Sequence, residues 1–320
     1  MALTLTVDLA AWRANIDAVR AEHPDLVPVI TGNGYGFGRT RLAAEVADWG
    51  MDELAVGTVH ELDTAGWASD APRSLVLTPA LTDELPVRHD AVLTVGRIEH
   101  VAAMLRARAT NRVIVKLASS MRRYGVEPVA LSTLLEAVAA AGLAVHGFGV
   151  HLPTAKPSAA NAAEIEAWLP HLPAGALLYL SHIDATTEAA LAAAHPGVRL
   201  RSRIGTRLWH GSKEFLHLGA DVLEVRAVRA GERAGYRQSA TPADGNLVMI
   251  GAGTAHGVHP LPDGRSPIHH HGRRLELHEN PHMHTTVAFV PAGQPVPTVG
   301  ESVDVQRPLT FVRPDVILER

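Results

Sequence analysis

The feature that most constrains the fold of this chain is a regular alternation along its first two thirds. Between residue 4 and about 210, short apolar runs take turns with amphipathic stretches of helical spacing. Counting from "VPVI" at residue 27, eight runs begin near residues 27, 53, 74, 91, 112, 143, 176 and 198. Eight strands in alternation with helices predict an α/β fold, a (β/α)8 TIM-type barrel.

An open, doubly wound sheet is the main alternative for such an alternation. That class usually carries a glycine-rich dinucleotide fingerprint after its first strand, and this chain has none. The barrel is therefore the fold that the sequence favours. The first run is preceded by a predicted helix that Asp8 can cap.

Past residue 220 the sequence changes character. β-rich runs such as "GNLVMIGAG" and "TTVAFVPAG" stand between Gly, Pro and Asp turns, and helical periodicity is almost absent. We therefore predict a barrel over residues 1–215 and an all-β C-terminal domain over residues 216–320. We expect the first strand, near residue 4, to pack with the C-terminal domain. The segment "SPIHHHGRR" at 266–274 predicts an exposed loop.

Composition excludes several classes of function. A net charge of −4 gives no electrostatic basis for nucleic acid or an anionic membrane as a partner. No basic start followed by an apolar segment is present, so we expect a cytoplasmic protein. The absence of cysteine excludes thiolate nucleophiles and cysteine-ligated metals. Only three lysines occur, Lys116, Lys156 and Lys213, and any mechanism that needs an amine must use one of them or import it.

Polar residues follow the predicted strands at several of their carboxyl ends, where the active site of a barrel forms. The stretch "VPVITGNGYGFG" ends the first run with four glycines, which let backbone approach a ligand. Chance would scatter the polar residues over helices as well, so their placement indicates a site. They are Tyr35, Lys116, Arg123, His151, Ser181, His182, Arg203, Gly205 and Thr206.

Five segments together resemble the alanine racemase family, the fold-type III enzymes that depend on pyridoxal phosphate (PLP). They are "VITGNGYGFG", "VKLASSMRRYG", "VHGFGVHLP", "SRIGTRLWHG" and "RAGERAGYRQ", in the family's order and close to its spacing. The resemblance runs from residue 7 to "VGESVDVQ" at 299 and is more specific in the N-terminal half. It implies a PLP-dependent amino-acid racemase, an isomerase that makes a D-amino acid, with alanine as the default substrate.

The resemblance also implies how the cofactor is held. Tyr35 and the backbone amides of Gly205 and Thr206 match positions that bind the cofactor phosphate. Arg203 matches the arginine that faces the pyridine nitrogen, and Arg123 matches the arginine on the cofactor hydroxyl. Lys116, which matches a lysine carbamylated in some members, is expected to support Arg123.

Other matches concern the substrate and the second subunit. His151 matches a histidine beside the pyridine ring, and Tyr236 matches a catalytic base supplied by the opposite subunit, which implies a head-to-tail homodimer. Met283 lies in a region that shapes the substrate entrance. The remaining phosphate ligand could be Ser181, His182 or Thr186, and the sequence leaves this choice open.

The most consequential departure from the family is Thr31, which stands at the position of the Schiff-base lysine. That lysine attaches the cofactor and then acts as a base on one face of the α-carbon. A threonine hydroxyl does neither, so we predict that racemisation is impaired or lost. Three explanations stay open: an engineered change, a natural relative that has dropped racemisation, or service by another amine, for which Lys116 is the candidate.

Two further functions remain as alternatives. A metal-assisted fold-type III D-amino-acid lyase would use His282 and His284, which lie two apart on a predicted strand and so share a face, with His256 as a possible third ligand. Those lyases also need the lysine. The other alternative is a non-catalytic protein that binds PLP or an amino acid in the same pocket.

Overall fold

The computed structural model describes residues 2–62, 72–81 and 90–320, which form two compact units. The barrel unit comprises residues 15–34 and 38–209. The β unit comprises the chain up to residue 14, residues 35–37 and residues 210–320. The predicted domain ranges of 1–215 and 216–320 stay a prediction. Among the described residues, no helix is both long and apolar enough to cross a bilayer.

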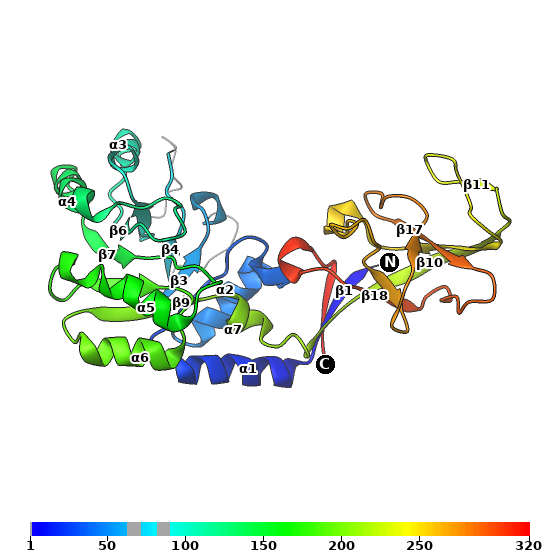
Figure 1. The fold of residues 1–320 in the computed structure, drawn as a ribbon, viewed down its shortest axis with the longest axis horizontal. Coiled ribbons are helices and arrows are strands. Elements are labelled where there is room, and N and C mark those ends of the chain that lie inside the picture. The colour runs from blue at the N-terminus through cyan, green and yellow to red at the C-terminus, as the bar shows by residue number, and fades with distance from the viewer. Residues whose placement is uncertain (1, 63–71, 82–89) are drawn as a thin grey trace. The chain divides into compact units, whose positions relative to one another are not determined.

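In the described residues, the barrel unit contains eight short strands that pair in parallel, and Figure 1 labels several of them. Six of them form one sheet in the order β2-β9-β8-β7-β6-β5, and β3 pairs with β4. Isolated parallel bridges from Val29 to Ala55 and from Leu75 to Val92 add the contacts β2 to β3 and β4 to β5. The pairings fit the predicted TIM-type barrel. The strands are β2 (Val27–Pro28), β3 (Glu53–Val56), β4 (Arg73–Val76), β5 (Leu93–Val95), β6 (Val113–Lys116), β7 (Val145–Gly149), β8 (Leu177–Leu180) and β9 (Arg199–Ile204).

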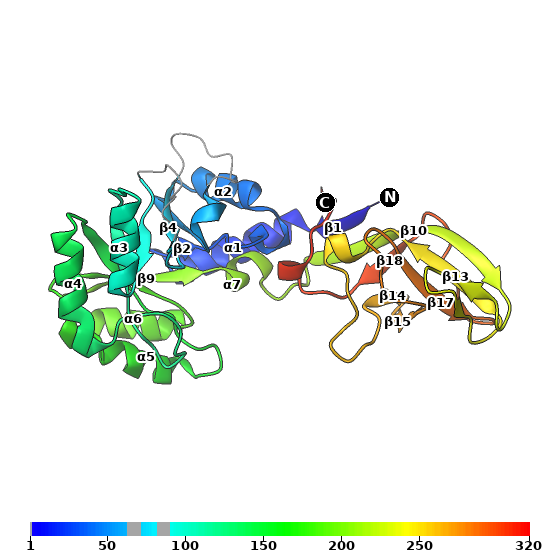
Figure 2. The same cartoon turned by 90° about the horizontal axis from the view of Figure 1, so that it is seen from above.

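Helices follow most of these strands, as the alternation in the sequence predicts (Figure 2). The helices expected after β3 and β4 fall largely on 63–71 and 82–89, outside the described residues. Before β2, the predicted cap of the first helix is confirmed, because the amide of Ala11 donates to Asp8 Oδ1 at 3.0 Å. The helices are α1 (Leu9–Glu22), α2 (Arg39–Asp48), α3 (Ile98–Arg106), α4 (Leu131–Ala140), α5 (Ser158–Glu166), α6 (Ala185–Ala194) and α7 (Thr206–His210).

The interior of the barrel unit is apolar because its strands are covered on both faces. All four residues of β3 are buried, which is the pattern of a parallel strand enclosed on both sides. Side chains from successive strands meet in one buried cluster. Its members are Val27, Val29, Ala55, Leu75, Val92, Ile114 and Tyr179.

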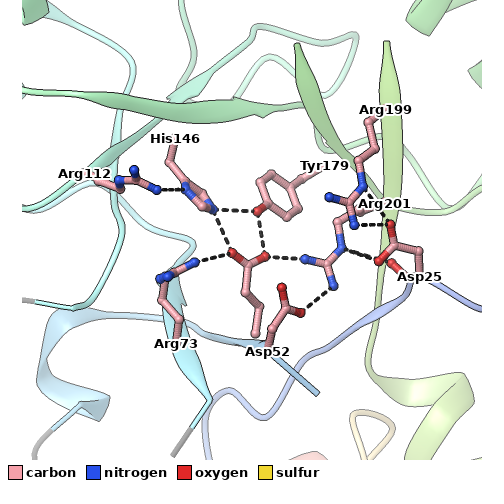
Figure 3. A network of polar contacts seen from close by, with 9 residues as sticks. Asp25, Asp52, Arg73, Arg112, His146, Tyr179, Arg199 and Arg201 are labelled. Atoms are coloured by element: carbon pink, nitrogen blue, oxygen red, sulfur yellow. Dashed lines mark hydrogen bonds and ion pairs between the residues drawn. The ribbon is translucent and has the colours of Figure 1, made fainter. Parts of the chain in front are cut away.

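A buried polar network lies at the amino-terminal end of the strands, around Glu53 (Figure 3). Glu53 Oε1 accepts from His146 Nε2 at 2.7 Å, and Oε2 accepts from the Tyr179 hydroxyl at 2.7 Å and from Arg201 Nη1 at 2.6 Å. Arg201 also reaches Asp52 at 3.0 Å and Asp25 at 3.0 Å. The network therefore ties β3 to β7, β8 and β9.

The network keeps Glu53 ionised although its side chain is only 2% exposed. Burial alone would raise the pKa of Glu53, but the hydrogen bonds from His146 and Tyr179 and the charge of Arg201 lower this pKa to about 2. Burial and the neighbouring carboxylate raise the pKa of Tyr179, so its hydroxyl stays a donor.

The β unit contains a sheet of the order β15-β14-β18-β10-β13-β17-β16, and β1 pairs antiparallel with β10 and parallel with β19. A β-rich C-terminal part follows the barrel, as predicted. The strands are β1 (Leu3–Val7), β10 (Leu216–Val228), β11 (Arg233–Ala234), β12 (Ser239–Ala240), β13 (Gly245–Ile250), β14 (Ile268–His270), β15 (Arg273–Arg274), β16 (Glu276–Leu277), β17 (Thr286–Pro291), β18 (Ser302–Val305) and β19 (Val316–Glu319).

One expectation about the β unit is wrong. The histidine-rich segment predicted as an exposed loop is the hairpin of β14 and β15, and His269 and His270 in it are buried. Periodicity could not show this, because a three-residue strand next to a two-residue strand is too short to produce a pattern.

The Glu53 network generates a prediction about stability. Replacing Glu53 with Ala leaves the guanidinium of Arg201, 3% exposed, without its most buried carboxylate. We expect Glu53→Ala to lower the free energy of unfolding by about 3–5 kcal/mol in urea titrations at pH 7. Because the pKa of Glu53 is depressed in the folded state, this contribution is present above pH 4.5 and fades as the pH falls toward 2.

The matched control is Asp17→Ala. It removes an exposed ion pair of the barrel unit, in which Asp17 Oδ1 lies 3.7 Å from Arg20 Nη1. This change should cost less than about 1 kcal/mol. Equal effects of the two substitutions would contradict the importance that we give to the network.

Candidate functional site

Three of the residues predicted from the sequence meet at the carboxyl ends of the strands. Lys116, Arg123 and His151 line a cavity of about 10 Å³, which is room for about one water molecule. Lys116 is the last residue of β6, and His151 lies two residues beyond β7. The remaining lining residues are Ser119, Met121 and Tyr124.

Lys116 is the one lysine of the chain with a buried side chain. It is 5% exposed, whereas the side chain of Lys156 is 42% exposed and Lys213 lies at the surface. Burial, together with the charges of Arg203 and Arg123, holds the pKa of Lys116 well below its usual value. Lys116 is thus the buried lysine amine of the site, next to the charges of Arg203 and Arg123.

His151 is held as a neutral ring by its neighbours. Burial, followed by the charges of Arg203 and Lys116, lowers the pKa of His151 to about 3. The Ser181 hydroxyl lies 2.9 Å from His151 Nδ1 and accepts the amide of Leu152 at 3.1 Å. Ser181 thus links the backbone after β7 to the ring of His151 and fixes the position of that ring.

Arg203 carries a positive charge that no carboxylate of the described residues neutralises within ion-pair distance. Its Nη2 donates to the carbonyl of Val150 at 2.6 Å, and its Nε donates to the carbonyl of Leu180 at 3.2 Å. Burial lowers the pKa of Arg203 to about 10, so the group stays protonated at neutral pH. An electron-rich or anionic ligand complements such a charge.

Arg123 is placed by Tyr124, a residue that the sequence analysis missed. Arg123 Nη2 donates to the Tyr124 hydroxyl at 3.2 Å, and its guanidinium lies 5.0 Å from the ring centroid. Ser119, also missed, donates its hydroxyl to the carbonyl of His151 at 2.6 Å. Tyr124 and Ser119 lie in the same segment after β6 as Arg123. Their position at the carboxyl end of a predicted strand could have identified them from the sequence.

Thr31 lies in the loop after β2 and faces a carboxylate. Its Oγ1 donates to Glu61 Oε1 at 3.4 Å, and Glu61 also accepts the amides of Gly32 at 3.1 Å and Gly57 at 2.7 Å. A Cβ at Gly57 would lie 2.2 Å from Thr31 Oγ1, so the threonine side chain needs glycine at this position. Sequence reasoning did not identify Glu61, which fixes the loop.

The residues predicted to hold the phosphate are placed as follows. Tyr35 belongs to the β unit, has a left-handed φ of 55°, and its carbonyl accepts His210 Nε2 at 2.7 Å. Gly205 and Thr206 belong to the barrel unit, where Thr206 begins α7. Amides in the first turn of a helix have no intrahelical partner and suit an anion.

Tyr236 lies in the β unit, in the turn between β11 and β12, and is 86% exposed. The turn is fixed by Glu279, whose Oε1 accepts the amide of Tyr236 at 3.2 Å and lies 2.8 Å from His282 Nε2. The rings of Tyr236 and His282 are 4.5 Å apart and edge to face. Gly235 is required here because a Cβ would lie 2.1 Å from Glu279 Oε1.

The histidines proposed as an alternative metal site have separate partners. His282 pairs with Glu279, while the ring of His284 packs 5.6 Å from that of His256, and His256 Nε2 lies 3.3 Å from Asp315. Met283 between them is 67% exposed. Among the described residues, the group whose ligand atoms do lie close enough for a metal contains none of these three histidines.

Comparison with known proteins points to one family. A family model described as "Alanine racemase, N-terminal domain" matches residues 7–211. The alanine racemase of Mycobacterium bovis is 27% identical over 297 residues, which cover 84% of this chain and 77% of that protein. That of Streptococcus equi subsp. equi is 24% identical over 279 residues, with coverages of 76% and 72%.

Solved structures agree at the level of the fold. The alanine racemase from Bartonella henselae, solved with covalently bound pyridoxal phosphate, has a TM-score of 0.72 at 16% identity and full coverage of both chains. The enzyme from D-cycloserine-producing Streptomyces lavendulae has a TM-score of 0.70 at 19% identity, covering 100% of this chain and 97% of that one.

The low pKa of His151 generates a prediction. Its folded value of about 3 lies below the ordinary value of 6.5, so between these pH values the unfolded state binds more protons and the free energy of unfolding falls with falling pH. This single group contributes at most about 1.4 kcal/mol per pH unit. Between pH 6.5 and pH 4, we expect the free energy of unfolding of His151→Gln, measured in urea titrations, to fall by less than that of the parent protein. Parallel curves would contradict a neutral, buried His151.

Proposed function

Because the chain belongs to the alanine racemase family, we propose that it is an alanine racemase-like scaffold that uses pyridoxal phosphate and in which Thr31 impairs or removes racemisation. One observation carries the proposal. Lys116, Arg123 and His151 meet at the carboxyl end of the barrel strands. The loop after β2 presents the hydroxyl of Thr31 where the family has a lysine amine. In this proposal the barrel is a complete (β/α)8 barrel.

The hydrogen-bond donors present match those that non-covalent binding of this cofactor needs, and the cavity of about 10 Å³ between Lys116, Arg123 and His151 would have to widen to admit its ring. Arg203, whose hydrogen bonds go to two carbonyls, would donate to the pyridine nitrogen and keep it unprotonated. Arg123 would hold the ring hydroxyl, supported by the amine of Lys116. Within the barrel unit, the amides of Gly205 and Thr206 would bind the phosphate, and Tyr35 of the β unit stays a predicted phosphate ligand. When bound, the cofactor supplies an electron-withdrawing ring that acidifies the α-hydrogen of an amino acid.

His151 and Ser181 act together in this proposal. The neutral ring of His151 would lie beside the pyridine, held in place by its hydrogen bond with Ser181. The prediction that Ser181, His182 or Thr186 binds the phosphate stays open. A neutral ring adds no positive charge next to Arg203, which limits repulsion among the buried cations of the site.

The residues present do not fit covalent attachment. Thr31 has no amine, and its hydroxyl is bound to the Glu61 carboxylate, which makes removal of its proton harder. Lys116 is a buried amine, but it stands on β6 beside Arg123, so we assign it the support of that arginine. The chain therefore lacks one of two bases that a racemase needs at the α-carbon.

Tyr236 would supply the other base from a partner subunit. Its exposed side chain on a turn anchored by Glu279 suits a group that works outside its own β unit. The proposed protein is therefore a head-to-tail homodimer. Its proposed substrate is a small amino acid, alanine by default, and Met283 would lie near the substrate entrance. The lyase and the non-catalytic alternatives gain no support, since the matching relatives are alanine racemases.

Restoring the amine tests the proposal. We expect Thr31→Lys to give purified protein the visible absorption of lysine-bound pyridoxal phosphate and to raise alanine racemisation by at least about 100-fold over the parent protein. Thr31→Met is the matched control, because it adds a side chain of similar length without an amine. It should gain neither the absorption nor the activity.

Two results would overturn this reading. Absence of both the absorption and the activity in Thr31→Lys would contradict the assignment of this loop to the cofactor. Parent protein that already racemises alanine as fast as Thr31→Lys would contradict the impairment by Thr31.

The oligomeric state is tested separately. We expect sedimentation at micromolar concentration to show a dimer. In the Thr31→Lys background, Tyr236→Phe should lower kcat/KM by about 100-fold or more in both directions of racemisation while leaving the dimer intact, because the phenol removes the proton in one direction and returns it in the other. A monomer in sedimentation would exclude a base supplied by a second subunit.

A further inference from the structure

The β unit holds a group of histidine and glutamate side chains that has no part in the site described above. His270, His271 and Glu301 place one nitrogen or oxygen atom each within 4.8 Å of one another. We propose that these three side chains form a binding site for a divalent transition metal, with Zn²⁺ as the expected ion. The proposal does not depend on the racemase assignment.

A tight hairpin brings the two histidines together. His270 ends β14, Arg273 begins β15, and the two-residue turn between them has left-handed φ values of 48° at His271 and 76° at Gly272. Two positive φ angles in a two-residue hairpin loop define a type I′ turn. As a result, the rings of His270 and His271 lie 4.1 Å apart.

The alternation of the strand separates the neighbouring histidine from this pair. Successive residues of a strand point to opposite faces, so His269 lies on the other side of β14. On the sheet, His269 is paired with Asp304 of β18 on one side and with Arg274 of β15 on the other. The site therefore takes two of the three consecutive histidines.

Glu301 is oriented toward the histidines by its own turn. One oxygen, Oε2, accepts the amide of Thr298 at 2.9 Å and its hydroxyl at 3.3 Å. The other, Oε1, lies 2.8 Å from His270 Nε2 and 3.5 Å from His271 Nε2. A ligand fixed in this way by a neighbouring donor is typical of metal sites, where such support raises affinity.

The distances match what a small metal ion requires. Zinc binds imidazole nitrogen and carboxylate oxygen at about 2.0–2.2 Å, which places tetrahedral ligand atoms about 3.3 Å apart. The two distances from Glu301 Oε1 bracket this value. Glu301 directly precedes β18, which pairs with β14, so adjacent elements of one sheet present the ligands.

The donor set indicates the kind of metal. Two imidazoles and one carboxylate suit zinc, cobalt or nickel, whereas magnesium and calcium prefer an all-oxygen shell. Three protein ligands leave a further position for water. The structural alternative is a simple histidine–carboxylate pair like His217 with Asp304, at 3.4 Å in the same β unit, which belongs to no three-ligand group of the described residues.

The test uses the full chain after removal of bound metal with a chelator. Equilibrium dialysis with Zn²⁺ should show one saturable site, and Co²⁺ should give the visible absorption of a four-coordinate ion. His271→Ala should weaken both by at least about 10-fold, and because the His271 side chain is 76% exposed, the fold should survive this change. His217→Ala is the matched control and should leave the site unchanged.

Glu301→Gln provides the second variant, with the same shape and without the negative charge. It should also weaken binding by at least about 10-fold, with an unchanged circular dichroism spectrum. Absence of a saturable site in the parent protein would overturn the proposal. A site that both His271→Ala and Glu301→Gln leave intact would overturn it as well, because the metal would then bind other histidines of the chain.

Discussion

The buried contact between Glu53 and Arg201 is the interaction on which the barrel unit depends. Each charge is almost fully removed from water, and each is matched at 2.6 Å by the other. Through His146 of β7, Tyr179 of β8 and Arg73 of β4, the same carboxylate reaches three further strands, so one ionised group links most of the parallel strands. The network lies at the amino-terminal end of the strands, opposite the end that carries Lys116 and His151.

The two ends differ most clearly along β9. Arg201 and Arg203 are two residues apart and therefore share a face of the strand. Arg201 meets carboxylates, whereas Arg203 meets only carbonyl oxygens among its hydrogen-bond acceptors. Burial, followed by the positive charge of Arg203, lowers the pKa of Lys116 and of His151, and this combination makes the carboxyl end chemically distinct.

In the β unit, carboxylates fix turns rather than strands. Glu279 binds the turn that carries Tyr236, and Glu301 is held by Thr298 and faces the hairpin of His270 and His271. In both cases a backbone amide occupies part of the carboxylate and a histidine occupies the rest. Polar side chains are thus presented at defined positions by short elements that contribute little core of their own.

The sequence by itself determined the barrel class, the β-rich C-terminal part and the family, because strand and helix periodicity and short motifs are local properties of the chain. It also identified Lys116, Arg123 and His151 from their places after β6 and β7. It did not identify Glu53, Glu61 or Glu279, because each acts through a partner far away in the sequence, and it missed Tyr124 although this residue is adjacent to Arg123. Only the tertiary structure decided which charges are buried, which arginine is neutralised and where the histidines pair, since burial and distance arise when separate strands pack together.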